Sequence, residues 1–137
     1  MFLKYKPTWM VEAIYQITPE QCHSLGIKAI LTDLDNTLIA WDNPDGTEEL
    51  RLWLEGMQTA GIPVIVVSNN SHDRVSEALK FLNLEFIPRA LKPFTKGINQ
   101  GVKRLGLTKD EVIMVGDQIM TDIKASNTAG VRSVLVK

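Results

Sequence analysis

The sequence predicts an α/β fold, a Rossmann-like, doubly wound parallel sheet of five main strands with helices on both faces. Two observations predict it. Short runs of apolar, often β-branched residues alternate with stretches whose apolar residues recur at helical spacing, and the alternation occurs five times. Three of these runs end in acidic, hydroxyl or amide residues. In an open parallel sheet the carboxyl ends of the strands share one edge, where ligands bind.

Length and composition predict one domain over residues 1–137, with a helical N-terminal lead-in (1–27) and a core (28–137). Hydrophobic residues make up 45% and charged residues 23%, as in ordinary soluble proteins. The net charge of −1 provides no basic field, so nucleic acid is not an expected partner. The single cysteine, Cys22, excludes an internal disulfide, and no apolar run approaches the ~18 residues of a membrane span. We therefore expect a cytoplasmic protein.

The N-terminal segment is predicted to contain two helices. The first spans about 9–16, and the second begins at the capping box of Thr18 and Gln21 and ends at Gly26. Apolar residues at helical spacing form one face of the first helix; they are Trp9, Met10, Ala13, Ile14 and Ile17. With Lys4 and Lys6, this face could rest on a membrane surface. Packing against its own domain is the alternative that general experience favours.

The core is predicted to alternate strands with helices. β-Branched apolar runs identify the strands, while capping residues and terminal glycines delimit most of the helices. The predicted strands are 29–32, 62–67, 84–87, 112–115 and 131–136. The predicted helices are 48–60 after Thr47, a segment carrying Val75 to Leu82, a helix from Thr95 to Gly106, and 122–129.

Polar side chains follow the predicted strands at the edge where the strands end. The first, second and fourth strands end in such residues, and a lysine lies in the loop after the third. In chain order they are Asp33, Asp35, Ser68, Asn69, Lys92 and Asp117. Acids, a hydroxyl, an amide and an ammonium at one sheet edge suit a phosphate bound together with a hard cation such as Mg²⁺.

The chemical properties of these side chains indicate a role for each. Asp33, Asp117 and a carbonyl near Asp35 could supply oxygen ligands to Mg²⁺, while Lys92 and Ser68 could bind phosphate oxygens. A carboxylate can attack a phosphate and form an aspartyl-phosphate if a cation neutralises the phosphate charge. A second acid is then needed to protonate the leaving alkoxide and activate water, and Asp35 fits that role.

For two residues near these strand ends, the sequence is compatible with more than one role. Asp122, five residues after Asp117, could cap a helix, pair with Lys92 or support a metal through water. Trp41 could cover the acid pair or simply pack, and a turn is predicted at 43–46 after it.

Four segments together resemble the motifs of the haloacid dehalogenase superfamily, in order and in spacing. They cover roughly residues 28–136 and are Asp33-Leu34-Asp35-Asn36-Thr37, Ser68-Asn69, Lys92-Pro93 and the run from Gly116 to Asp122. The resemblance implies a phosphatase with Asp33 as nucleophile and Asp35 as general acid and base. It also implies a phosphate site formed by Ser68, Asn69 and Lys92. It implies a magnesium site formed by Asp33, Asp35 and Asp117, with Asp122 supporting them.

The resemblance is to the capless members of the superfamily, of the subfamily IIIA type. Residues 38–61 and 70–91 leave no room for the cap domain that encloses small substrates in many relatives. Capless members tend to act on macromolecular or membrane-presented phosphates, or to borrow a neighbouring subunit as a lid. The run from Thr32 to Leu38, the following Trp41-Asp42 and the N-terminal lead-in resemble the bacterial phosphatidylglycerophosphate phosphatase group, which would make a lipid phosphate the substrate.

Two alternatives to a lipid phosphatase remain. One is a small-metabolite phosphatase, acting on a sugar phosphate or phosphoglycolate, whose site is closed by oligomerisation. The other is a receiver-like phospho-acceptor module, which shares the sheet, the acids and the lysine. It is disfavoured because the second strand ends in Ser68 and the third in no aspartate, so no acceptor stands where that scheme needs one.

Overall fold

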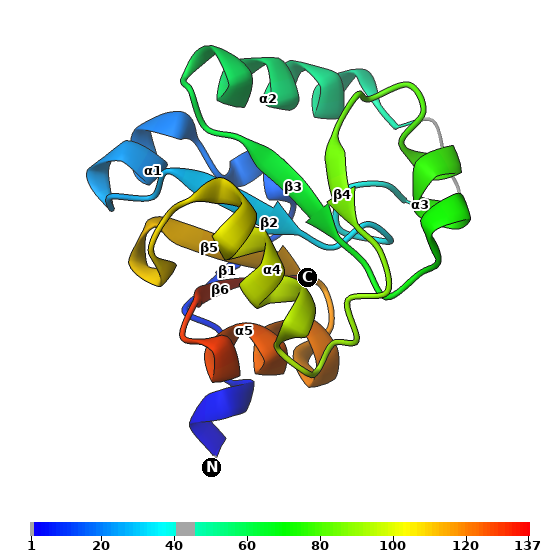
Figure 1. Ribbon diagram of the computed structural model, residues 1–137. Helices are drawn as coiled ribbons and strands as arrows, with labels where there is room; N and C mark the ends of the chain where they lie inside the picture. The colour runs from blue at the N-terminus through cyan, green and yellow to red at the C-terminus, as the bar shows by residue number, and fades with distance from the viewer. Residues whose placement is uncertain (1, 41–45) are drawn as a thin grey trace.

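The computed structural model describes residues 2–40 and 46–137 and contains one parallel sheet (Figure 1). The strand order is β1-β6-β5-β2-β3-β4, and every neighbouring pair is parallel. The strands are β1 (Trp9–Val11), β2 (Ala29–Thr32), β3 (Val64–Val67), β4 (Glu85–Ile87), β5 (Val112–Gly116) and β6 (Arg132–Val136). The predictions for Trp41 and for most of the turn at 43–46 fall outside the described residues.

Helices cover both faces of this sheet, as predicted (Figure 1). They are α1 (Pro19–Ser24), α2 (Glu48–Thr59), α3 (His72–Ala78), α4 (Lys96–Leu105) and α5 (Lys124–Ala129). Helices α1, α2 and α3 lie on one face, and α4 and α5 lie on the other. Three 3-10 turns (Phe2–Tyr5, Ile14–Gln16 and Lys109–Glu111) and one π-helical turn (Ile119–Ile123) complete the set.

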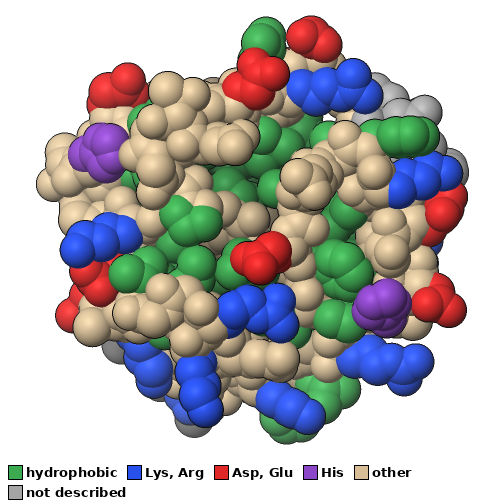
Figure 2. All heavy atoms as spheres, turned by 45° about the horizontal axis from the view of Figure 1, so that its top comes forward, with side chains coloured by type: hydrophobic (Ala, Val, Ile, Leu, Met, Phe, Trp, Pro, Cys, Tyr) green, Lys and Arg blue, Asp and Glu red, His purple; other side chains and the backbone are tan. Residues whose placement is uncertain are grey.

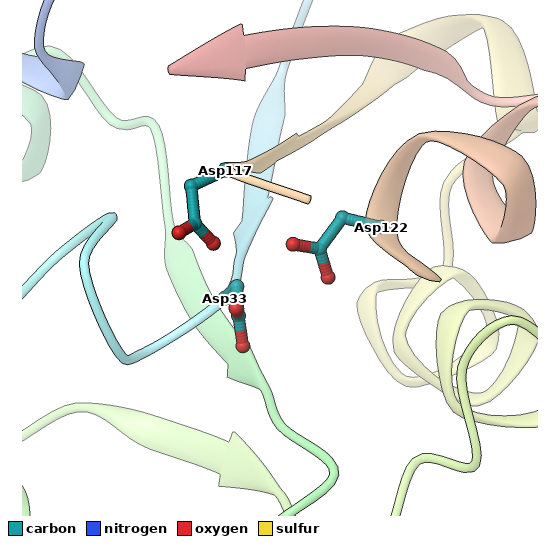
Figure 3. Close-up of side chains that lie close together, drawn as sticks. All are labelled: Asp33, Asp117 and Asp122. Atoms are coloured by element: carbon teal, nitrogen blue, oxygen red, sulfur yellow. The ribbon is translucent and has the colours of Figure 1, made fainter. Parts of the chain in front are cut away.

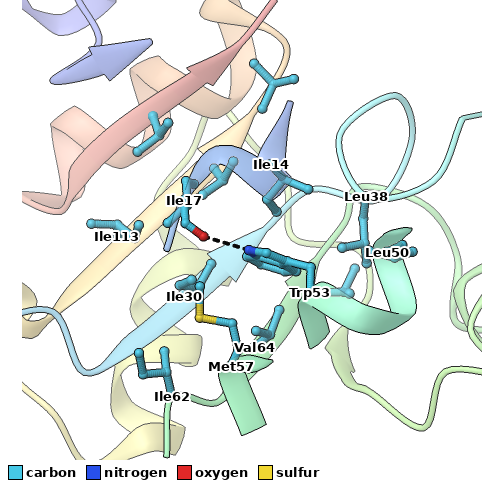
Figure 4. Packing of buried hydrophobic residues seen from close by; sticks show 14 of the residues in the cluster. Ile14, Ile17, Ile30, Leu38, Leu50, Trp53, Met57, Ile62, Val64 and Ile113 are labelled. Atoms are coloured by element: carbon cyan, nitrogen blue, oxygen red, sulfur yellow. Dashed lines mark hydrogen bonds between the residues drawn. The ribbon is translucent and has the colours of Figure 1, made fainter. Parts of the chain in front are cut away.

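Alternate residues of the central strands serve two separate hydrophobic cores. In β2, Ile30 faces the α2 side while Ala29 and Leu31 face α4 and α5. Strand residues alternate in direction, so a strand buried on both faces reads as an uninterrupted apolar run. In the core on the α2 side, the indole Nε1 of Trp53 donates to the Ile17 carbonyl at 2.7 Å (Figure 4). That bond satisfies the one polar atom of a buried tryptophan.

The prediction of a helix over residues 9–16 is wrong. Residues Trp9–Val11 form strand β1, which pairs with β6, and only Ile14–Gln16 make a short 3-10 turn. Two hydrogen bonds stabilise the start of this pairing: the Thr8 N–H donates to the Ser133 hydroxyl, and the Ser133 N–H donates to the Thr8 hydroxyl. The sheet therefore has six strands rather than five, and the lead-in is only partly helical. Its apolar residues Ile14 and Ile17 are buried in the domain's own core, the favoured alternative to a membrane contact.

The other element predictions are confirmed with small shifts of boundary. The predicted capping box at Thr18 is present and Thr47 caps α2, and a second capping box forms at Thr108. Helix α3 is shorter than predicted, because it ends at Ala78 and a turn carries the chain on to β4. Residues 122–129 divide between the π-helical turn and α5.

No cap domain interrupts the fold in the residues that the structure describes, because α2, α3 and β4 account for the two stretches where one is usually inserted. Acidic and basic side chains are interspersed on the face shown in Figure 2, with hydrophobic side chains visible between them. None of the described helices is both long and apolar enough to span a bilayer.

Candidate active site

The strand order places the predicted site residues at the middle of one sheet edge. Strand β2 lies between β5 and β3, so the segments that follow these three strands emerge side by side. The main-chain N–H of Asp33 still bonds the Val115 carbonyl at 2.9 Å, and that of Ser68 bonds the Ile87 carbonyl at 3.0 Å. Asp33 and Ser68, which are far apart in sequence, are therefore both held by main-chain hydrogen bonds at the same edge of the sheet.

Three carboxylates from this edge face a common space (Figure 3). They belong to Asp33 after β2, Asp117 after β5 and Asp122 in the π-helical turn, and each offers an oxygen within 4.8 Å of the other two. Asp33 and Asp117 therefore meet, although 84 positions separate them in the sequence. This meeting is the geometry that the proposed metal chemistry requires.

The Lys92 ammonium lies between two of these acids. Its Nζ donates to Oδ1 of Asp33 at 3.0 Å and to Oδ1 of Asp122 at 2.6 Å, and the residue is only 5% exposed. The side-chain amide of Asn69 makes two hydrogen bonds to the main chain of Lys92. Its Nδ2 donates to the Lys92 carbonyl, and its Oδ1 accepts from the Lys92 N–H. The contact of Asn69 with phosphate stays a prediction.

Asp122 is fixed from two sides. Oδ1 accepts the Lys92 ammonium, and Oδ2 accepts the Gln118 N–H at 3.3 Å. A side chain at Gly116 would overlap the Asp122 carboxyl group, so the glycine makes room for it. The pairing of Asp122 with Lys92 is confirmed, and the helix-cap interpretation is wrong, because Asp122 lies inside the π-helical turn. Its support of a metal stays a prediction.

Burial makes this cluster costly to ionise. Burial raises the pKa of Asp117, and the neighbouring charge of Asp33 raises it further. Burial also raises the pKa of Asp122, in spite of the Lys92 ammonium. Acids that repel one another in a partly dry site ionise together only beside compensating positive charge. Lys92 provides one such charge, and a bound cation would provide more.

One oxygen of the cluster indicates where a cation fits. Asp117 Oδ1 is buried and has no hydrogen-bond partner among residues 2–40 and 46–137. A buried carboxylate oxygen left unpaired is unfavourable, and hard divalent cations take such oxygens as ligands. The donor set of Asp33, Asp117 and Asp122 therefore fits a divalent metal.

The Asp35 carboxylate lies outside this cluster and is held by the segment that follows β3. Oδ2 accepts from Asn70 Nδ2 at 2.9 Å, and Oδ1 accepts from the Arg74 guanidinium at 3.0 Å. The sequence analysis missed both partners. Asn70 directly follows the predicted Ser68 and Asn69, a signal that could have included it. Arg74 lies in the first turn of α3, where an exposed arginine is unremarkable.

Ser68 completes the inner part of the site. It is almost fully buried, and its hydroxyl accepts the Asn70 N–H at 3.1 Å. Its hydroxyl hydrogen has no acceptor among the residues described here, so it is available to a ligand oxygen.

The loops at this edge hold unusual backbone conformations. Asn36, Arg89 and Leu91 all have positive φ, at 62°, 49° and 62°. Such conformations cost free energy for side chains other than glycine and concentrate at functional sites. The strain supports a functional role for this edge.

The fold and the site together place the protein among Rossmann-like proteins whose chemistry is phosphoryl transfer. A doubly wound sheet with an acid cluster and a buried lysine at its carboxyl edge can hold a phosphoryl group beside a divalent cation.

Comparison with known proteins identifies the family. A family model described as haloacid dehalogenase-like hydrolase matches residues 4–136. "Probable phosphatase YqeG" of Bacillus subtilis (strain 168) is 40% identical over 132 residues, which cover 96% of this chain and 77% of that protein. The chain therefore belongs to the haloacid dehalogenase-like hydrolase family, and it is a phosphatase. The superfamily resemblance is confirmed, and the receiver-like alternative is wrong.

Two solved structures show the same fold. A predicted phosphoglycolate phosphatase from Haemophilus somnus 129pt has a TM-score of 0.61 at 18% identity, covering 80% of this chain and 85% of that chain. The 3-deoxy-D-manno-octulosonate 8-phosphate phosphatase of Moraxella catarrhalis, in complex with magnesium, phosphate and KDO, has a TM-score of 0.51 at 19% identity, covering 76% and 62%. At these identities the likeness supports the fold and leaves the substrate open.

Proposed function

We propose that this phosphatase hydrolyses phosphomonoesters with Mg²⁺ through an aspartyl-phosphate on Asp33. The observation that carries the proposal is the meeting of Asp33, Asp117 and Lys92 at the end of the central strand. A carboxylate so placed has a cation on one side and a second acid with an unpaired oxygen on the other. The lysine ammonium reduces the repulsion between a carboxylate nucleophile and an anionic phosphate, and a divalent cation bound by the two acids would reduce it further.

The reaction has two displacements at phosphorus. In the first, an Asp33 oxygen bonds to phosphorus, the bond to the substrate's alkoxide breaks, and Asp35 gives its proton to the leaving oxygen. In the second, Asp35 takes a proton from water, the water oxygen bonds to phosphorus, and Asp33 is released with inorganic phosphate. Lys92 and Ser68 hold the phosphoryl oxygens throughout.

The metal site of this proposal consists of the aspartates predicted from the sequence. Asp33, Asp117 and Asp122 would contribute carboxylates, and Asp35 its main-chain carbonyl. When bound, Mg²⁺ would neutralise phosphoryl charge and orient the phosphate for attack by Asp33.

The surface around the site supports a phosphate presented by a lipid. Large hydrophobic side chains flank the two loops that carry Lys92 and Asp122, and we call them the apolar rim: Leu91, Phe94, Ile119 and Met120. Phe94 and Met120 are 72% and 65% exposed. Exposed apolar groups gathered at one place mark contacts with proteins or membranes. We infer a membrane-bound phosphomonoester, of the phosphatidylglycerophosphate type, as the substrate.

The same rim also supports the second candidate, a small-metabolite phosphatase. A second copy of the chain could cover the apolar rim and close the open site over a sugar phosphate or phosphoglycolate, because water exclusion strengthens the electrostatic contacts inside. The two candidates differ in what the rim touches, a lipid surface or another subunit.

A substrate panel separates them. Phosphatidylglycerophosphate in micelles is compared with soluble sugar, nucleotide and protein phosphates, each with Mg²⁺ and with a chelator. A higher kcat/KM for the lipid, selectively reduced in Phe94→Ser and Met120→Ser, is the expected result. A preference for a soluble phosphate together with a dimer in sedimentation would favour the second candidate. Full turnover in the chelator would overturn the metal assignment.

A further inference from the structure

The guanidinium of Arg74 contacts Asp35, the proposed general acid, and the mechanism above assigns no role to Arg74. Its Nη2 lies 3.0 Å from Oδ1 of Asp35, on the side of the site that faces solvent. The side chain of Arg74 is 56% exposed, in contrast to the buried Lys92. The two cations therefore serve different parts of the site.

Arg74 lies on the side of the site where the leaving group of the substrate would bind. In the proposed reaction Asp35 protonates the leaving oxygen, so the Asp35 carboxyl must contact that oxygen. A cation in contact with Asp35 then lies beside the first few atoms of the departing alcohol. Lys92, bonded to Asp33, lies beside the phosphoryl group instead.

Arg74 has hydrogen-bonding capacity to spare. A guanidinium carries five N–H donors, and one bond, to Asp35, accounts for its contacts within the described parts of the chain. Its planar fork is suited to a carboxylate or phosphate, which it can hold with two parallel bonds. An exposed arginine at the rim of a site can therefore keep its contact with Asp35 and bind an anion of the substrate.

We propose that Arg74 selects substrates whose leaving alcohol carries a second anionic group, a phosphodiester or a carboxylate, close to the phosphomonoester. The inference rests on the proposed function, since the leaving-group side is defined by Asp35. It deepens that function by naming a specificity-determining residue.

Asn70 makes this inference testable by mutation. Its Nδ2 holds the other oxygen of Asp35, and its own N–H is bonded to Ser68. When Arg74 is replaced, one of the two contacts that place Asp35 therefore remains. A loss common to all substrates then reports on Asp35, and a loss confined to anionic leaving groups reports on recognition.

The experiment compares two matched pairs of substrates with Mg²⁺: 2-phosphoglycolate against ethyl phosphate, and dihexanoyl phosphatidylglycerophosphate against glycerol 3-phosphate. In Arg74→Gln, kcat/KM for at least one anionic member should fall about tenfold to a hundredfold further than for its neutral partner, the usual effect of losing a charged hydrogen-bond donor. Arg74→Lys should recover part of the difference. Arg51→Gln, on the exposed side of α2, is the matched control and should leave both ratios unchanged.

The pair that responds identifies the anion as a carboxylate or a phosphodiester, and either response supports the proposal. Equal losses within both pairs would overturn it and leave the phosphatase assignment intact. Calorimetric binding of the same compounds to Asp33→Asn, with and without Arg74→Gln, gives a readout that needs no turnover. If the wild-type chain hydrolysed none of the four compounds, the proposed function would fail for them, and the binding difference would still decide the role of Arg74.

Discussion

The inner and outer halves of the site are built differently. The inner half consists of Asp33, Ser68, Lys92 and Asp122. The last three are buried, Lys92 donates to both aspartates, and the Ser68 carbonyl accepts from Ala90 in the loop that carries Lys92. The outer half consists of Asp35, Arg74 and the apolar rim, which are half-buried or exposed. Chemistry common to all phosphomonoesters needs a fixed, dry environment, whereas the choice among leaving groups needs contact with solvent and with the substrate's remainder. Under the proposed mechanism we therefore expect the inner half to set the rate and the outer half to set the selectivity.

Replacement of the proposed nucleophile is the most severe test of the inner half. Asp33→Asn keeps the size of the side chain and its contact with Lys92, so the fold should persist while turnover falls by about three orders of magnitude or more. Steady-state kinetics with thermal unfolding as the folding control measures both. Near-normal turnover in a folded variant would refute the nucleophile assignment.

A smaller effect is expected for the proposed acid and base in the outer half. Asp35→Asn removes the proton donor but can still accept a bond from Arg74, so turnover should fall by about 10²–10⁴. The aspartyl-phosphate on Asp33 should then accumulate, because its hydrolysis also needs Asp35. Acid quenching and mass measurement detect the phosphorylated chain. Turnover equal to that of wild type would exclude Asp35 as acid and base.

The smallest of the three effects concerns packing beneath the inner half. In Gly116→Ala the new methyl group overlaps the Asp122 carboxyl, so Asp122 and its bond to Lys92 must shift at a cost of about 1–3 kcal/mol. Denaturant unfolding should report this loss together with reduced kcat.

Gly56→Ala is its control. Outside its own stretch of α2, no atom of the described residues lies within 4 Å of the added methyl group at that exposed position, so the substitution should stabilise the chain by about 0.5–1 kcal/mol and leave kcat unchanged. A Gly116→Ala variant that behaved like this control would show that the Asp122 carboxyl tolerates displacement.

The parts of this molecule that the sequence predicts are those whose signal is local. Strands β2, β3 and β5 are buried on both faces and appear as unbroken apolar runs, and the polar residue after each run marks the sheet edge. The meeting of Asp33 with Asp117 follows from that edge, and the structure bears out the expectation.

What the sequence did not predict depends on distant partners. The apolar spacing over residues 9–17 suits a helix, and only pairing with β6, more than a hundred residues away, makes Trp9–Val11 a strand. Likewise, an exposed arginine in α3 carries no sign of function until the fold brings it to Asp35. In both cases a contact between residues distant in sequence determines the structure or the role, and the local sequence does not reveal it.

The pairing of β1 with β6 has a consequence for how the protein is made. On the ribosome the N-terminal strand emerges first, yet its hydrogen-bonding partner, Arg132–Val136, is synthesised more than a hundred residues later. Throughout that interval Trp9 and its neighbours lack this partner strand and expose apolar surface to chaperones and proteases. The pairing of β1 with β6 can therefore form only after Arg132–Val136 has been synthesised and has left the ribosome.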